Sequence, residues 1–200
     1  MRLKDKVAIV TGASRGIGAE IASMFAAEGA RVVLAARSME EMEQLRQSIS
    51  RQGGESICVS TDVRSRESMK NMVKTACDAY GAIDILVNNA GYFYDVAPLV
   101  EMSDDQVNNT IDINLKGTMY MSREVCRRLV DAGTPGRVIN ITSGAAHSGR
   151  VNFSNYCASK AGILGLTRAM ALELAPAHIN VNSVSVGYVE VGRWEGDPSK

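Results

Sequence analysis

The stretch that decides the fold is KVAIVTGASRGIG, residues 6–18. Its first half is a short apolar run of the kind found in buried parallel strands. Gly12, Gly16 and Gly18 follow, and residues 17–25 then carry a bulky apolar side chain at every fourth position, which predicts a helix. A glycine turn between a strand and a helix lets the backbone approach a pyrophosphate, and the free N–H groups at the helix start bind it. The stretch therefore predicts a dinucleotide site, with an ordinary glycine-rich turn as the alternative.

The rest of the chain continues this alternation of short β-branched runs and helical patterns. The predicted strands cover residues 6–12, 30–36, 56–62, 83–91, 137–143 and 179–185. The predicted helices cover a segment beginning at residue 17 and residues 39–49, 69–80, 104–130 and 155–175. Strands that alternate with helices form a parallel sheet with helices on both faces. The sequence therefore predicts an α/β fold with a doubly wound parallel sheet in three layers, α/β/α, and a single domain over residues 1–200.

Composition argues against several classes of protein. Lysine plus arginine equals aspartate plus glutamate, 22 of each in 200 residues, so no basic excess indicates nucleic-acid binding. No stretch is apolar for long enough to cross a bilayer, which predicts no membrane partner. The four cysteines are widely spaced and form no CxxC or zinc-ligand pattern. This spacing favours reduced thiols, a cytoplasmic location and no metal.

The end of the second predicted strand indicates which dinucleotide fits. Many NAD-binding folds have an acidic residue here that bonds the ribose hydroxyls. This chain has Ala36 followed by Arg37, and Arg15 lies within the glycine turn. A planar guanidinium makes two charge-assisted bonds to a phosphate, so the two arginines predict a 2′-phosphate and hence NADP(H). The alternative is that both arginines are solvated surface charges.

Six motifs in the chain resemble those of the single-domain short-chain dehydrogenase/reductase family, and they occur in the family's order. They are TGASRGIG at 11–18, Asp62 in TDV, NNAG at 88–91, Asn114 in INLKG, Ser143 in NITS, and Tyr156 with Lys160 in SNYCASKAG. The resemblance covers essentially the whole chain and implies a Rossmann-like fold. The catalytic residues that it implies are Asn114, Ser143, Tyr156 and Lys160. The cofactor-binding residues that it implies are Gly12, Ser14, Arg15, Gly16, Ile17, Gly18, Arg37, Asp62, Val63, Asn89, Ala90, Gly91, Tyr156, Lys160, Gly187 and Val189.

Tyr156 and Lys160 are four residues apart, so they lie one above the other on a helix. A free tyrosine has a pKa of about 10, and nearby positive charge favours the phenolate. We therefore expect Lys160 and an oxidised nicotinamide to lower the pKa of Tyr156. In reduction, Tyr156 is expected to give its proton to the carbonyl oxygen, which Ser143 also binds. The alternative is a tyrosine that packs and a lysine that points to water.

The resemblance assigns further roles around this pair. It implies that Asp62 contacts the adenine and that residues 89–91 line the adenosine side. Asn114 is implied to distort its helix and to hold a water molecule that supplies Lys160. Backbone groups near Val189 are implied to hold the carboxamide of the nicotinamide.

Two features depart from the family pattern. The sixth strand continues as SVSVGYVEVG, where Val186 replaces the usual proline and Val191 the usual threonine, while Gly187 is kept. Family chains also commonly extend further and add lid helices and a seventh strand. We therefore expect this chain to lack those parts and to leave its sixth strand at an exposed edge. Either the sequence stops short of the natural protein or this is a shortened member.

Together these observations predict an oxidoreductase that transfers a hydride between NADP(H) and a carbonyl or secondary-alcohol substrate, which is a ketone, a 3-oxoacyl thioester or a keto sugar. The alternative is a nucleotide-binding regulatory or interaction module without turnover. Family analogy also implies a homodimer or homotetramer that pairs through residues 104–130 and 155–175. Two questions stay open: whether the aromatic residues 92–94 line a substrate cleft or pack elsewhere, and whether His147 contacts substrate or faces water.

Overall fold

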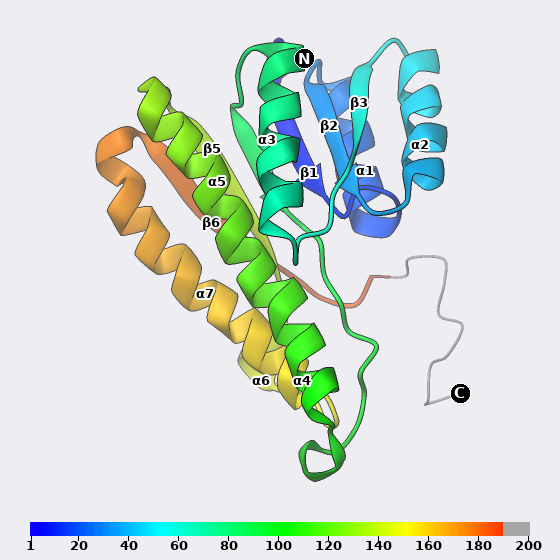
Figure 1. Ribbon diagram of the computed structural model, residues 1–200, viewed down its shortest axis with the longest axis vertical. Helices are drawn as coiled ribbons and strands as arrows, with labels where there is room; N and C mark the ends of the chain where they lie inside the picture. The colour runs from blue at the N-terminus through cyan, green and yellow to red at the C-terminus, as the bar shows by residue number, and fades with distance from the viewer. Residues whose placement is uncertain (190–200) are drawn as a thin grey trace.

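The computed structural model describes residues 1–189, and its central feature is one sheet of six strands (Figure 1). The strands are β1 (Val7–Thr11), β2 (Arg31–Ala36), β3 (Glu55–Ser60), β4 (Ile85–Asn88), β5 (Gly136–Ser143) and β6 (Ile179–Val186). All neighbouring pairs are parallel, and the order across the sheet is β3-β2-β1-β4-β5-β6. The chain reverses its direction of travel between β1 and β4, which creates the crevice where such sheets bind ligands. The predicted doubly wound parallel sheet is confirmed.

Helices cover both faces of this sheet (Figure 1). The helices α1 (Gly16–Ala27) and α2 (Met39–Arg51) pack on one face, and α3 (Arg66–Tyr80), α5 (Gly117–Ala132) and α7 (Ser154–Leu174) on the other. An apolar core lies on each face of the sheet, and successive side chains of β1 alternate between the two. Ala8 and Val10 face α1 and α2, whereas Val7 and Ile9 face the other layer. This alternation is the period of a strand buried on both sides, and it confirms the three layers.

The residues of helix α1 that pack most fully against the sheet are small. The side chains that it buries fully are small, Ala22 and Ala26, together with Gly18. Ile21 and Phe25 are only partly buried and pack along the side of the helix against the same core. The small residues shorten the distance between helix and strand, which brings the first turn of α1 close to the end of β1.

The helix predicted over residues 104–130 is not regular along its length. It consists of α4 (Asp104–Ile111), the π-helical turn η2 (Asp112–Lys116) and α5. The prediction of one uniform helix is therefore wrong, while the distortion at Asn114 that the family resemblance implied is confirmed. Asn114 lies in the π turn, and such turns are frequently found at functional sites.

The remaining elements connect this framework. A short 3-10 turn η1 (Leu99–Glu101) precedes α4, the one-turn helix α6 (Ala145–Ser148) follows β5, and η3 (Ala175–Ala177) ends α7 next to Pro176. Among residues 1–189 no strand pairs with the outer side of β6, where Val184 is 49% exposed. In the same part of the chain, no helix has an apolar stretch long enough to cross a membrane. The Val191 position discussed above lies outside the described residues.

Candidate active site

The glycine turn has the backbone geometry that its sequence requires. Gly12 and Gly16 have φ angles of +66° and +56°, in the left-handed region that disfavours other residues. At Gly18 the reason for glycine is contact, because a Cβ there would lie 2.3 Å from the carbonyl oxygen of Gly12. The prediction that these three glycines permit a tight turn and close helix packing is confirmed.

The N-terminus of α1 opens toward the same place. Arg15 occupies the N-cap position without a side-chain cap bond, and the first turn carries no acidic residue. The N–H groups of that turn and the positive end of the helix dipole are thus left for an anion. This is the arrangement in which strand, turn and helix hold a pyrophosphate.

A cleft of about 1120 Å³ runs along the carboxyl edge of the sheet from the glycine turn to α7. Of the predicted site residues, all but Gly18 and Asn114 line it. Those at its walls are Gly12, Ser14, Arg15, Gly16, Ile17, Arg37, Asp62, Val63, Asn89, Ala90, Gly91, Ser143, Tyr156, Lys160, Gly187 and Val189. The fold therefore brings together residues from both halves of the sequence, and Gly18 and Asn114 support the walls from behind.

A hydrogen-bond network that the sequence did not reveal fixes the glycine turn against β4. The Thr11 hydroxyl accepts from the backbone N–H groups of Asn89 and Ala90, both at 3.0 Å. The Asn89 side-chain amide donates in return to the carbonyl oxygens of Thr11 at 2.9 Å and Gly12 at 3.3 Å. Both walls of the crevice are held in one geometry, which a bound ligand does not have to impose.

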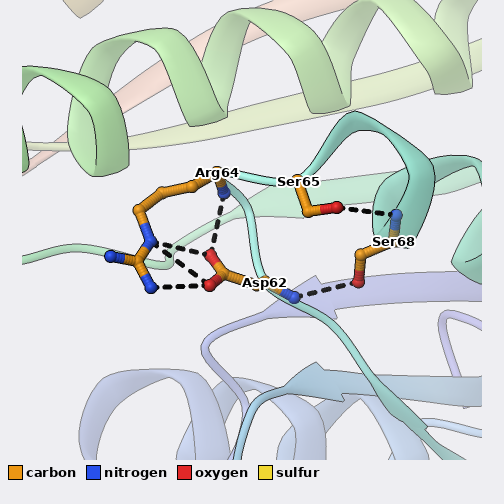
Figure 2. Close-up of polar contacts among 4 residues, drawn as sticks. All are labelled: Asp62, Arg64, Ser65 and Ser68. Atoms are coloured by element: carbon orange, nitrogen blue, oxygen red, sulfur yellow. Dashed lines mark hydrogen bonds and ion pairs between the residues drawn. The ribbon is translucent and has the colours of Figure 1, made fainter.

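At the far end of the cleft, Asp62 is bound by a neighbouring arginine (Figure 2). Its carboxylate accepts from the Arg64 backbone N–H at 2.9 Å and from the Arg64 guanidinium at 2.7 Å. The Asp62 N–H donates to the hydroxyl of Ser68, while the Ser65 hydroxyl caps α3 by accepting from the N–H of Ser68. The hydrogen bonds from Arg64, with the charge of Arg37 as a smaller cause, lower the pKa of Asp62.

This end of the cleft is positively charged. Arg15, Arg37 and Arg64 all line it, and only Arg64 pairs with a carboxylate among the described residues. Arg37 lies near enough to Asp62 to affect its pKa. Sequence reasoning found the first two arginines and missed Arg64, although its place two residues after Asp62 was a usable signal.

The other end of the cleft holds the predicted proton-transfer pair. Tyr156 and Lys160 lie on α7, and the Lys160 Nζ is 5.8 Å from the centre of the Tyr156 ring. Ser143 ends β5, and its side chain hydrogen-bonds the Tyr156 phenol. A phenol, a hydroxyl and an amine therefore meet at one wall, and this excludes the alternative in which Lys160 points into water.

Lys160 is buried, with 4% of its surface exposed. Its Nζ donates to the Ile141 carbonyl oxygen at 3.0 Å, and its own carbonyl oxygen accepts from the Thr142 hydroxyl at 2.9 Å. Burial lowers the pKa of Lys160 to about 8, because desolvation disfavours the ammonium. A buried amine with a strongly lowered pKa at the wall of a cleft is a candidate functional group.

The expected lowering of the Tyr156 pKa by Lys160 is not what the structure gives. Burial raises the pKa of Tyr156, while the hydrogen bond from Ser143 and, to a smaller extent, the charge of Arg150 act to lower it. Desolvation outweighs both because the phenolate is poorly solvated in this wall. The charge that acts to lower the pKa of Tyr156 is that of Arg150, a residue that the sequence analysis did not single out.

Asn114 stands behind this wall and is fully buried. Its side-chain oxygen accepts from the Tyr92 N–H at 2.6 Å, and its amide donates to the Tyr92 carbonyl oxygen and the Ser159 hydroxyl. The Asn114 carbonyl oxygen accepts from the Thr118 hydroxyl at 2.7 Å. These contacts account for the π turn: they draw Asn114 toward α7 and the segment after β4. Ser159, which the sequence analysis did not single out, is thus the residue through which Asn114 contacts α7.

Aromatic side chains form the remaining wall. Tyr92, Phe93 and Tyr94 line the cleft, and the Phe93 ring lies 4.6 Å from that of Tyr94 and 6.4 Å from that of Tyr156. The open question about these residues is thus answered in favour of the cleft. His147 is exposed and is not among the residues that line the cleft, so it faces water.

Comparisons with known proteins place the chain in a family. A family model described as short chain dehydrogenase matches residues 6–198. The galactitol 2-dehydrogenase of Agrobacterium fabrum is 39% identical over 195 residues, which are 98% of this chain and 75% of that protein. Among solved structures, an actinorhodin polyketide ketoreductase with NADPH superposes with a TM-score of 0.90 at 36% identity, covering 94% of this chain and 72% of that one. An NAD+-bound xylitol dehydrogenase superposes with a TM-score of 0.92 at 34% identity, covering 96% and 74%.

The chain therefore belongs to the short chain dehydrogenase family, and its class of reaction is oxidoreduction at an alcohol or keto group. Nicotinamide cofactors are common to the family, with NADPH in one solved relative and NAD+ in another. The resemblance drawn from the six sequence motifs is confirmed.

Proposed function

We propose that this protein is an NADP(H)-dependent oxidoreductase that interconverts a ketone and a secondary alcohol. The observation that carries the proposal is the arrangement of one cleft. A glycine turn with free N–H groups forms one end, together with two arginines that have no ion-pair partner within residues 1–189, and Ser143, Tyr156 and buried Lys160 form the other. The predicted sugar and 3-oxoacyl substrates remain within this class.

The residues present fit a nicotinamide dinucleotide. A Cβ at Gly18 would collide with the backbone of the turn, so the sequence keeps the turn compact enough for a pyrophosphate to reach the N–H groups of α1. Asp62 and residues 89–91 would hold the adenosine half, and Gly187 and Val189 would lie beside the nicotinamide half. When bound, the cofactor supplies or accepts the hydride.

The side chains on α7 and β5 supply the proton and the alignment. In reduction the Tyr156 phenol donates its proton to the carbonyl oxygen, which the Ser143 hydroxyl binds as well. The raised pKa of Tyr156 keeps the phenol protonated at neutral pH, so it is ready to act as the acid. Asn114 does not touch the reacting atoms in this account; it positions α7 through Ser159 and the wall through Tyr92.

The preference for NADP(H) follows from the charges at the far end of the cleft. Arg64 pairs with Asp62 and Glu41 lies at the same end, but within residues 1–189 neither carboxylate forms an ion pair with Arg15 or Arg37, which leaves both arginines for a 2′-phosphate. Charge-assisted hydrogen bonds are worth about 1.5–3 kcal/mol each, enough for a preference of tenfold or more.

Two measurements test the proposal, and the first compares the two cofactors. Fluorescence titration with NADPH and NADH should give the tighter binding to NADPH, and Arg37→Gln should remove most of the difference. Comparable affinities for the two cofactors in the wild type contradict the assignment.

A second measurement is NADPH oxidation in the presence of a panel of ketones, oxoacyl thioesters and keto sugars, and at least one of these substrates should be turned over. Tight NADPH binding without turnover of any of them would favour the nucleotide-binding module instead.

We further propose a homodimer formed through α5 and α7. The outer side of α7 presents small or apolar residues to solvent, with Leu172 at its end 80% exposed. Met119 on α5 is also exposed, at 43%. Apolar surface of this kind is expected to be covered by another chain. Sedimentation should give a dimer for the wild type and a shift toward monomer for Leu172→Glu; a wild-type monomer contradicts the idea.

Two broader proposals complete this account. One continuous sheet joins β1 to β6, which supports a single cofactor-binding catalytic domain over residues 1–200. All four cysteines are free thiols, which supports a cytoplasmic location. Limited proteolysis that released two stable fragments would contradict the first proposal, and extracellular fractionation would contradict the second.

A further inference from the structure

One cation in the cleft has no role in the function proposed so far. Arg150 lies in the connection between α6 and α7 and lines the cleft together with Ser143 and Tyr156. The glycine turn, the two arginines at the far end and Lys160 are assigned to the cofactor and the proton transfer. Arg150 belongs to neither group, and it lines the cleft near the Ser143 and Tyr156 end.

Arg150 is exposed to solvent, and its guanidinium packs on an aromatic ring that neighbours Tyr156. It lies 4.4 Å from the centre of the Phe153 ring, a cation–π contact. Phe153 is 8% exposed, and its ring is 6.3 Å from that of Tyr156 in an edge-to-face arrangement. A guanidinium stacked on a ring keeps its N–H donors free around its own edge. Phe153 thus holds Arg150 on the side of the cleft where Tyr156 lies, with the guanidinium donors open to a ligand.

Among the residues that the structure describes, Arg150 has no acidic partner. Within residues 1–189, no aspartate or glutamate forms an ion pair with Arg150. The two acidic residues that line the cleft, Glu41 and Asp62, stand with Arg37 and Arg64 at the adenosine end. Among the described residues, the end of the cleft near Tyr156 therefore carries a positive charge without an acidic partner. The effect of Arg150 on the pKa of Tyr156 is further evidence that the charge is felt at the phenol.

We propose that Arg150 is a specificity-determining residue that binds an oxyanion of the substrate, so that the preferred substrates are ketones carrying a carboxylate or a phosphate. This inference rests on the proposed ketone reduction and narrows its substrate class. The planar fork of arginine matches both anions in a bidentate manner. Phe93 and Tyr94 line the same end of the cleft and offer apolar surface to the rest of such a substrate.

The test uses pairs of related ketones in which one member carries an anionic group and the other is neutral. One pair is benzoylformate and its methyl ester, and a second pair is dihydroxyacetone phosphate and dihydroxyacetone. The ratio of kcat/KM for the anionic and neutral members is measured in the wild type, in Arg150→Gln and in Arg150→Lys. The ratio is scored because a change in the Tyr156 pKa affects both members of a pair alike. Arg51→Gln, an exposed arginine on α2 outside the cleft, is the matched control.

We expect the wild type to prefer the anionic member of at least one pair, and Arg150→Gln to lower that ratio about tenfold, as loss of a charge-assisted bond predicts. Arg150→Lys keeps the charge without the fork and should fall between them, and Arg51→Gln should match the wild type. The carboxylate and phosphate pairs show which oxyanion fits. An unchanged ratio in Arg150→Gln, or a wild type that prefers the neutral members, overturns the inference while leaving the ketone reduction standing. NADPH binding without turnover of any member overturns the proposed function and this inference with it.

Discussion

Gly18→Ala is the substitution for which the structure gives the most direct expectation. A Cβ at this position would lie 2.3 Å from the Gly12 carbonyl oxygen and 2.4 Å from the Asn89 side-chain nitrogen. Neither atom can move away freely. The first is backbone in a turn with positive φ, and the second holds the carbonyl oxygens of Thr11 and Gly12. The turn and α1 must therefore separate to admit one methyl group.

The cost follows from these contacts. Overpacking of a tight site costs about 1–3 kcal/mol, and each neutral hydrogen bond that Asn89 loses costs about 0.5–1.5 kcal/mol. We expect the free energy of unfolding to fall by about 2–5 kcal/mol, since both contributions apply. For a chain of this size that corresponds to a loss of about 5–15 °C in Tm. NADPH binding should weaken as well, because the same movement opens the pyrophosphate site.

The assay is thermal unfolding followed by circular dichroism, with and without NADPH. Gly165→Ala is the matched control: Gly165 is also helical, but nothing lies within 4 Å of the position that its Cβ would occupy. Alanine is favoured over glycine in a helix by about 0.5–1 kcal/mol, so the control should keep or raise the Tm. A Gly18→Ala protein with the Tm and NADPH affinity of the wild type refutes the reasoning about the turn.

Three further substitutions test separate parts of the structure. Tyr156→Phe should abolish ketone-dependent NADPH oxidation but preserve NADPH binding by fluorescence titration; retained turnover contradicts its role as the acid. Asn140→Ala removes the buried amide that accepts from Asn88 and donates to Thr167, and chemical denaturation should show a loss of about 2–4 kcal/mol, against almost none for the exposed Asn180→Ala. Lys160 has a folded-state pKa of about 8, against an ordinary value of 10.5. Between these two pH values the unfolded chain therefore binds more protons than the folded one. The free energy of unfolding of the wild type should rise by about 3 kcal/mol across this pH range. Lys160→Met should lack that rise, and equal slopes in the two proteins contradict the burial argument.

The sequence predicted well those parts of the fold that depend on neighbouring residues along the chain. The six strands are short apolar runs because a parallel sheet buries both faces of each strand. The glycine turn was predictable because positive φ at Gly12 and Gly16 and close packing at Gly18 each leave glycine as the residue that fits. Local spacing also placed Tyr156 and Lys160 on one helix.

What the sequence did not predict depends on contacts between distant segments. The bond from Asn114 to Ser159 joins residues 45 positions apart, and the bonds from Asn89 to Thr11 span 78. No periodicity records such pairs, so the atomic cause of the π turn and the brace behind the glycine turn came only from the structure. The pairing of Asp62 with Arg64 is local, yet it was missed because a carboxylate near a cofactor site was considered for the ligand alone.

The prediction that Lys160 lowers the pKa of Tyr156 was wrong for a related reason, and the outcome decides which form of the phenol is present. Counting charges predicts a lowered pKa, but burial affects both members of the pair, raising the pKa of Tyr156 and lowering that of Lys160 to about 8. Each shift favours the neutral form, so near neutral pH the phenol keeps its proton. A protonated phenol is the acid that ketone reduction needs, whereas alcohol oxidation needs the phenolate as a base. Only the hydrogen bond from Ser143 and the charge of Arg150 favour the phenolate among the groups acting on Tyr156. Without a bound cofactor, burial at this wall thus favours the protonated phenol, the form that donates the proton in ketone reduction.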